Sequence, residues 1–199
     1  MTNGAEADDV RRRFNDSVRG LRGRRLTAVD YWDVYNYGPD PAVWDYGDWH
    51  HAVMGVQLGT DLGPVTVTWT STFYPYGVEV FHEPIEHHVV VDEHGPQRIG
   101  PNLEGDSPWA PLLGSQISDT AVHWEQLRIG PSYRSDGRIV GAAYEVDVPV
   151  ALRLDFDAGP VWYVAGSAGF TDGRRADGRV PSARLMHGAC RPRPGSGGG

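Results

Sequence analysis

Alternation of apolar and polar residues predicts two strands in the first half of the chain. Residues 50–58 place every second residue on one face, from His50 to Leu58. Residues 65–73 do the same, and four threonines share their opposite face. This pattern is typical of strands with one buried face. The turn at 59–64 predicts a hairpin whose apolar faces match in the pairs Leu58–Val65, Val56–Val67, Met54–Trp69, Ala52–Ser71 and His50–Phe73.

A second block of strands is predicted over residues 121–170. It comprises a strand at 121–129 and a long alternating strand at 139–156, in which Pro149 indicates an edge or a bulge. A tight turn at 157–159 then leads into 161–165. We expect Trp162 and Val164 to lie opposite Leu154 and Leu152.

Other segments carry their own signals. Apolar residues at helical spacing predict a helix over 5–22, with Val10, Phe14, Val18 and Leu21 as its buried stripe. Residues 26–37, 78–82 and 88–91 are predicted as strands. Residues 95–120 are predicted as a long loop with a helical turn near 109–113.

Together these elements predict a mainly β fold of about eight strands, either an antiparallel barrel or a two-sheet sandwich. We expect three regions: a basic amphipathic helix at 1–25, a single acidic β domain at 26–170, and a disordered basic tail at 171–199. The tail carries two Asp-Gly-Arg repeats and ends in Arg-Pro-Arg-Pro and a Gly-rich stretch.

Amino-acid composition indicates the cellular compartment in which the protein occurs. The chain has one cysteine, so no disulfide can form within it, which favours a reducing compartment. The first residues lack the apolar core of a signal peptide, and no apolar run is long enough for a membrane helix. We therefore expect a cytoplasmic protein without membrane contact. All eighteen basic residues are arginine, which indicates a high-GC bacterial genome.

Charge is unevenly distributed along the chain. Residues 1–25 carry a net +3, residues 26–170 a net −15 and residues 171–199 a net +4. An acidic body repels phosphate backbones, so we expect no nucleic-acid binding by the fold itself. The same charge would attract a basic protein, although solubility alone also explains it.

Six histidines between residues 50 and 94 suggest a metal site, because imidazole and carboxylate are ligands of zinc and non-haem iron. His50 and His82 occupy inward positions at strand ends, so the predicted ligands of a divalent metal are His50, His82 and His87. No established metal-binding spacing occurs. Surface or hydrogen-bonded core histidines are the alternative interpretation.

Acid–base chemistry is a second possibility near the same place. His50, Tyr74 and Glu79 are candidate catalytic residues, although the charge partner of His50 cannot be named from the sequence.

Aromatic residues suggest a ligand or partner surface at the end of the first hairpin. The candidate binding residues are Met54, Trp69, Phe73, Tyr76 and Trp49. Packing beneath the N-terminal helix is the alternative explanation for these aromatics.

The leading functional expectation is a non-catalytic binding domain that engages a basic protein partner. An immunity protein that neutralises a basic nuclease is one example of this class. The alternative is a small β-barrel enzyme or ligand-binding protein with a pocket near His50, Trp69 and Phe73, with a metal at His50 and His82.

Overall fold

The structure is a computed structural model that describes residues 4–33, 44–45, 49–51, 54–69, 72–73, 77–89, 97–99, 109–165 and 184–188. Within these residues one α-helix, α1 (Gly4–Arg19), precedes a mainly β body with two 3-10 turns, η1 (Ile85–His87) and η2 (Ala110–Leu112). The predicted mainly β class and the N-terminal helix are confirmed. None of the described helices is long and apolar enough to span a bilayer.

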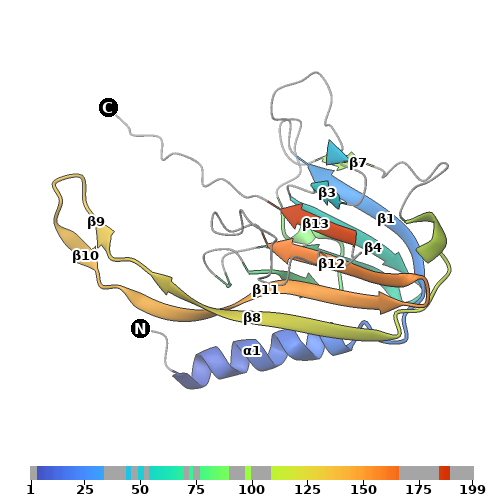
Figure 1. The fold of residues 1–199 in the computed structure, drawn as a ribbon, viewed down its shortest axis with the longest axis horizontal. Helices are drawn as coiled ribbons and strands as arrows, with labels where there is room; N and C mark the ends of the chain where they lie inside the picture. Colours follow the sequence, from blue (N-terminus) through green and yellow to red (C-terminus); the bar gives the residue numbers. More distant parts are fainter. Residues whose placement is uncertain are drawn as a thin grey trace, which may run out of the picture.

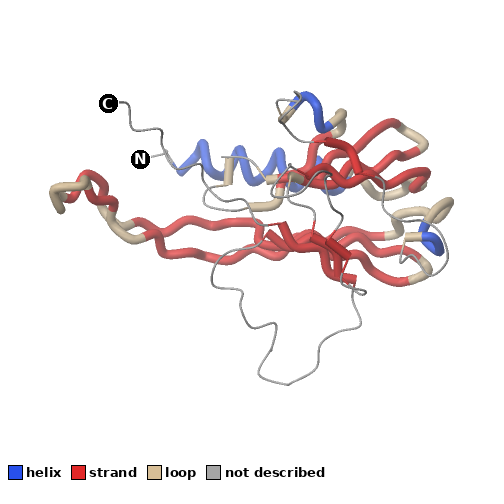
Figure 2. Tube along the Cα trace, turned by 90° about the horizontal axis from the view of Figure 1, so that it is seen from above, coloured by secondary structure: helices blue, strands red, loops and turns tan. Residues whose placement is uncertain are grey.

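Two sheets form the body, and Figure 2 shows them as two layers. The five-stranded sheet is antiparallel, in the order β6 (Glu79–Phe81), β5 (Gly63–Thr68), β4 (Gly55–Thr60), β1 (Leu26–Asp33) and β7 (Gln97–Ile99). The six-stranded sheet has the order β2 (Trp44–Asp45), β3 (Trp49–His51), β13 (Arg184–Gly188), β12 (Gly159–Ala165), β11 (Tyr144–Phe156) and β8 (Asp119–Ile129).

Neither sheet closes on itself in the described residues, so the barrel, one of the two predicted architectures, is not confirmed. The two sheets instead share a buried core to which both contribute, for example Leu58 and Val67 from one and Leu152 and Leu154 from the other. Thirteen strands are described, where about eight were predicted. Several of the extra strands have only two or three residues, which is too short for alternation to reveal them.

The first predicted hairpin is confirmed over its central part. Val56 pairs with Val67 and Leu58 with Val65, as the matching of apolar faces required. The extension of that strand back to His50 is wrong, because β4 begins at Gly55, whose φ is +138°. His50 lies in β3 of the other sheet and pairs with Met186 and Asp45. The apolar–polar alternation continues through 50–58 although the chain changes sheets there.

The strand register of the second hairpin differs by one residue from the predicted register. Leu152 pairs with Tyr163 and Leu154 with Val161, so the predicted pairing of Trp162 with Leu154 is wrong. The turn consists of only Asp157 and Ala158, because Phe156 already pairs with Gly159. This register buries Tyr163 and leaves Trp162 half-buried. The predicted irregularity at Pro149 is confirmed: the register of β11 against β8 shifts between Pro149 and Ala151.

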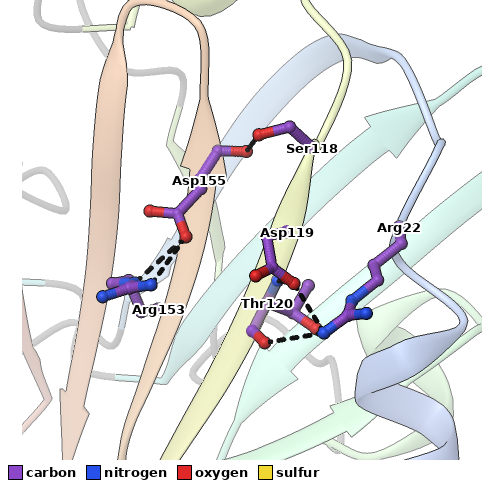
Figure 3. A network of polar contacts seen from close by, with 6 residues as sticks. All are labelled: Arg22, Ser118, Asp119, Thr120, Arg153 and Asp155. Carbon is purple, nitrogen blue, oxygen red and sulfur yellow. Dashed lines mark hydrogen bonds and ion pairs between the residues drawn. The ribbon is translucent and has the colours of Figure 1, made fainter.

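Helix α1 runs beside β6 and β8, the two edge strands on one side of the layers (Figure 1). The predicted stripe faces the core: Phe14, Val18 and Leu21 are buried and Val10 is partly buried against them. Beyond its C-terminal end, the Arg22 guanidinium contacts the Asp119 carboxylate and the Thr120 carbonyl of β8 (Figure 3). The helix therefore covers the side of the core that the strands leave open.

Part of the predicted disordered tail is a strand. Residues 184–188 form β13, which is parallel to both of its neighbours, β12 and β3. A five-residue strand with partners on both sides has its backbone hydrogen bonds satisfied by the sheet. That stabilisation does not depend on a hydrophobic pattern in the strand itself. Residues 171–183 and 189–199 lie outside the described residues.

Candidate functional site

A groove of about 570 Å³ lies between the first half of α1 and the ribbon formed by β8 and β11. The helix lines it with residues 6–8, 10 and 11, and the ribbon with Trp124, Gln126 and residues 144–147. Thr72 and Phe73 close its inner end.

Two aromatic rings, those of Phe73 and Trp124, form the floor of the groove, and Phe14 packs against both and joins them to the core. Phe14, Phe73 and Trp124 pack edge to face, with ring centroids 5.2 to 5.7 Å apart. Such aromatic pairs contribute about 0.5–1.5 kcal/mol each beyond the area they bury. Phe73 and Phe14 are buried, whereas Trp124 is half-buried and reaches the groove. The core thus holds Trp124 in place at a surface that remains open.

One arginine of the chain already lies on this tryptophan. The Arg11 guanidinium carbon is 4.3 Å from the centroid of the Trp124 ring, and Arg11 Nη1 is 2.9 Å from Asp147 Oδ2. Both charged side chains are about half exposed, so the ion pair by itself contributes little stability. The arrangement shows which chemistry the floor accepts, a guanidinium stacked on an indole beside a carboxylate.

The rim of the groove is acidic. Four carboxylates line it, those of Glu6, Asp8, Glu145 and Asp147, against the single cation of Arg11. This excess of negative charge around an aromatic floor attracts cations and disfavours anions.

The residues predicted from sequence separate into several places. Phe73 lies in the groove, whereas Met54, Trp69 and Glu79 are not among the residues that line it. Two of these three lie close to Thr68, which pairs with Glu79 and donates a hydrogen bond of 2.6 Å from Oγ1 to the Met54 carbonyl. Of the pocket predicted around Met54, Trp69 and Phe73, the groove therefore contains Phe73 alone.

His50 and His82 lie on opposite sides of the molecule. β3, which carries His50, is four strand spacings from β8 in its sheet, about 19 Å. His82 follows β6 and contacts α1, which also contacts β8. Tyr74 and Tyr76 lie outside the described residues, and for Trp49 and His50 only the backbone is described.

The described histidines have partners other than metal. His82 Nε2 donates to the Ser17 carbonyl at 2.8 Å, and burial lowers the pKa of His82. His87 Nδ1 is 3.1 Å from Glu83 Oε2, and this hydrogen bond lowers the pKa of Glu83. The His88 ring stacks on Phe81 at 3.7 Å. Across the part of the chain that the structure describes, no three potential ligands are grouped for a metal ion.

Apart from Phe73, the residues that shape the groove were not among the candidates predicted from the sequence. Arg11 belongs to a run of three arginines, of which Arg12 and Arg13 pair with Asp9 on the helix surface. The helical stripe indicated that something covers Val10 and Phe14. It carried no signal that the covering residue is Trp124, 110 positions after Phe14.

Comparisons of the chain with protein families, with curated proteins and with solved structures found no match.

Proposed function

We propose that this protein is a non-catalytic binding domain of the cytoplasm, and that its groove holds an arginine-bearing segment of a basic protein partner. The observation that supports the proposal is the Arg11 guanidinium over Trp124 beside Asp147. In the bound state a partner arginine takes that position and Arg11 moves to the solvent-facing rim.

The charge of the chain favours this class of partner. Two of the rim carboxylates, Glu145 and Asp147, belong to a body of net −15 over residues 26–170, and Glu6 and Asp8 of α1 complete the rim. Such a field increases the association rate of a basic segment and weakens as salt screens it. Arginine is preferred over lysine, because its planar guanidinium stacks on the indole while its N–H groups reach a carboxylate.

The test is titration of the purified protein with an arginine-rich peptide of about twelve residues, followed by calorimetry at low and at high salt. We expect binding at low salt that weakens as salt is raised. We expect the matched lysine peptide to bind about tenfold more weakly, which corresponds to about 1.4 kcal/mol.

Trp124→Ala is the decisive variant, and Trp162→Ala is its matched control. Trp162 is also half-buried and also has an arginine over its ring, with Arg153 Cζ at 5.7 Å, but it lies outside the groove. We expect Trp124→Ala to weaken peptide binding at least tenfold and Trp162→Ala to leave it unchanged. Circular dichroism verifies that both variants are folded. Equal loss in both variants, or no binding by the parent protein at low salt, contradicts the proposal.

A further inference from the structure

The ribbon of β8 and β11 continues beyond the groove as a projecting arm. Its far end carries the short hairpin of β9 (Ser132–Tyr133) and β10 (Ile139–Gly141), and Figures 1 and 2 both show it extending away from the two sheets. Of residues 130–145, all but Pro131 and Gly141 are exposed. We use "the arm" for residues 127–146.

The arm has one apolar face and one polar face. Cross-strand partners lie on the same side of a ribbon. The pairs Val146–Leu127 and Tyr144–Ile129 alternate with the pairs Asp147–Gln126 and Glu145–Arg128. Near the tip, Tyr133 pairs with Ile139, and these side chains are 60% and 59% exposed. The apolar face begins in the groove at Val146 and continues outward without cover.

A two-stranded ribbon whose apolar face is exposed to water has an unfavourable free energy unless another surface covers that face. A two-stranded hairpin is at best marginally stable in water, and contiguous exposed apolar residues mark interaction surfaces. The described residues of the body supply no covering layer for the arm, since its tip residues remain exposed.

The charge distribution of the arm favours a second copy of this chain as the partner that covers its apolar face. Beyond the Glu145–Arg128 pair, residues 129–144 carry two arginines and one aspartate, a net +1. At the base, the groove has four carboxylates, those of Glu6, Asp8, Glu145 and Asp147, against the cations of Arg11 and of Arg128, which lies opposite Glu145. Two copies laid antiparallel along their apolar faces bring each basic tip to the acidic base of the other.

We propose that the arm is a dimerisation element, in which the apolar faces of two copies pack antiparallel about a twofold axis. From Asp136 at the tip to Val146 at the base the arm spans about 33 Å, which sets the length over which the two copies overlap. A ribbon about 10 Å wide gives a small interface, so we expect the dimer to be weak. The inference goes beyond the proposed function and does not depend on it.

The first experiment is sedimentation velocity of the full chain from about 5 to 500 μM at low salt. We expect a concentration-dependent dimer in the parent protein, weakened at least tenfold in Tyr133→Ser/Ile139→Ser. Leu62→Ser is the matched control, because Leu62 is 72% exposed in the turn between β4 and β5, outside the arm. A parent protein that stays monomeric throughout overturns the proposal. So does a double variant that dimerises as well as the parent.

The second experiment tests the antiparallel arrangement by disulfide trapping in a Cys190→Ser background. Ser135→Cys places a thiol at the tip and Glu145→Cys places one at the base. Mixing the two variants under mild oxidation is expected to yield mainly tip-to-base heterodimers. Efficient crosslinking of Ser135→Cys with itself, equal to that of the mixture, overturns the antiparallel arrangement.

Discussion

Gly77→Ala tests how tightly the two sheets are joined at the inner end of the groove. Gly77 N donates to the Phe73 carbonyl at 2.8 Å, and Val78 N donates to the Pro149 carbonyl at 2.8 Å, which links β6 to β11. A Cβ at Gly77 would overlap the Cβ of Phe73. It would also lie 2.9 Å from Pro149 Cδ and 3.1 Å from Val148 Cγ1.

These neighbours have little freedom to move. The atoms met are a Cβ, a proline ring carbon and a methyl of fully buried Val148, so none is the far end of a flexible side chain. The overlap caused by the added Cβ can be removed only if the backbone shifts on one side of the contact. Overpacking a core costs about 1–3 kcal/mol, and this geometry belongs at the upper end, about 3 kcal/mol. With a urea m-value of about 2 kcal/mol/M, the midpoint falls by about 1.5 M.

Urea unfolding followed by tryptophan fluorescence measures the effect. Gly130→Ala is the matched control, because a Cβ at Gly130 meets no atom within 4 Å and its φ is outside the left-handed region. We expect that variant to unfold within about 0.5 kcal/mol of the parent. If Gly77→Ala unfolds at the same urea concentration as Gly130→Ala, the inferred close packing at Phe73 and Pro149 is refuted.

Three further variants test individual polar side chains. Burial, and next the neighbouring Arg24, lower the pKa of His82 below its usual 6.5, although the hydrogen bond to Ser17 opposes them. The unfolded chain therefore binds the proton more tightly, and stability present above pH 6.5 is lost as pH falls below it. His82→Gln should flatten this loss in urea titrations between pH 7.5 and 5.5, and an unchanged slope contradicts the assignment. The Tyr163 hydroxyl is buried and has no hydrogen-bond partner among the described residues, so Tyr163→Phe should raise the free energy of unfolding by about 1 kcal/mol. Tyr31→Phe should lower it by a similar amount, because the Tyr31 hydroxyl accepts from buried Trp109 Nε1. Thermal melts that shift in the same direction for both tyrosine variants refute this reasoning.

The candidate site shows where sequence reasoning stops. Phe73, one of the predicted binding candidates, lines the groove, but its partners were expected in the same hairpin. They come instead from α1 and β8, which are far away in sequence. His50 was expected beside Phe73, because the alternating pattern runs unbroken into β4. Local alternation reports which face a residue occupies and carries no information about which sheet the strand joins.

Periodicity by itself determined the elements that bury a repeating apolar face. The stripe of α1 and the pairs Val56–Val67 and Leu58–Val65 follow from it, since any other phase exposes apolar side chains to water. Only the tertiary structure decided the sheet of His50, the strand at 184–188 and the meeting of Arg11 with Trp124. These features depend on contacts between distant segments, whose free energy arises from the complete packing arrangement and leaves no repeating pattern in either segment.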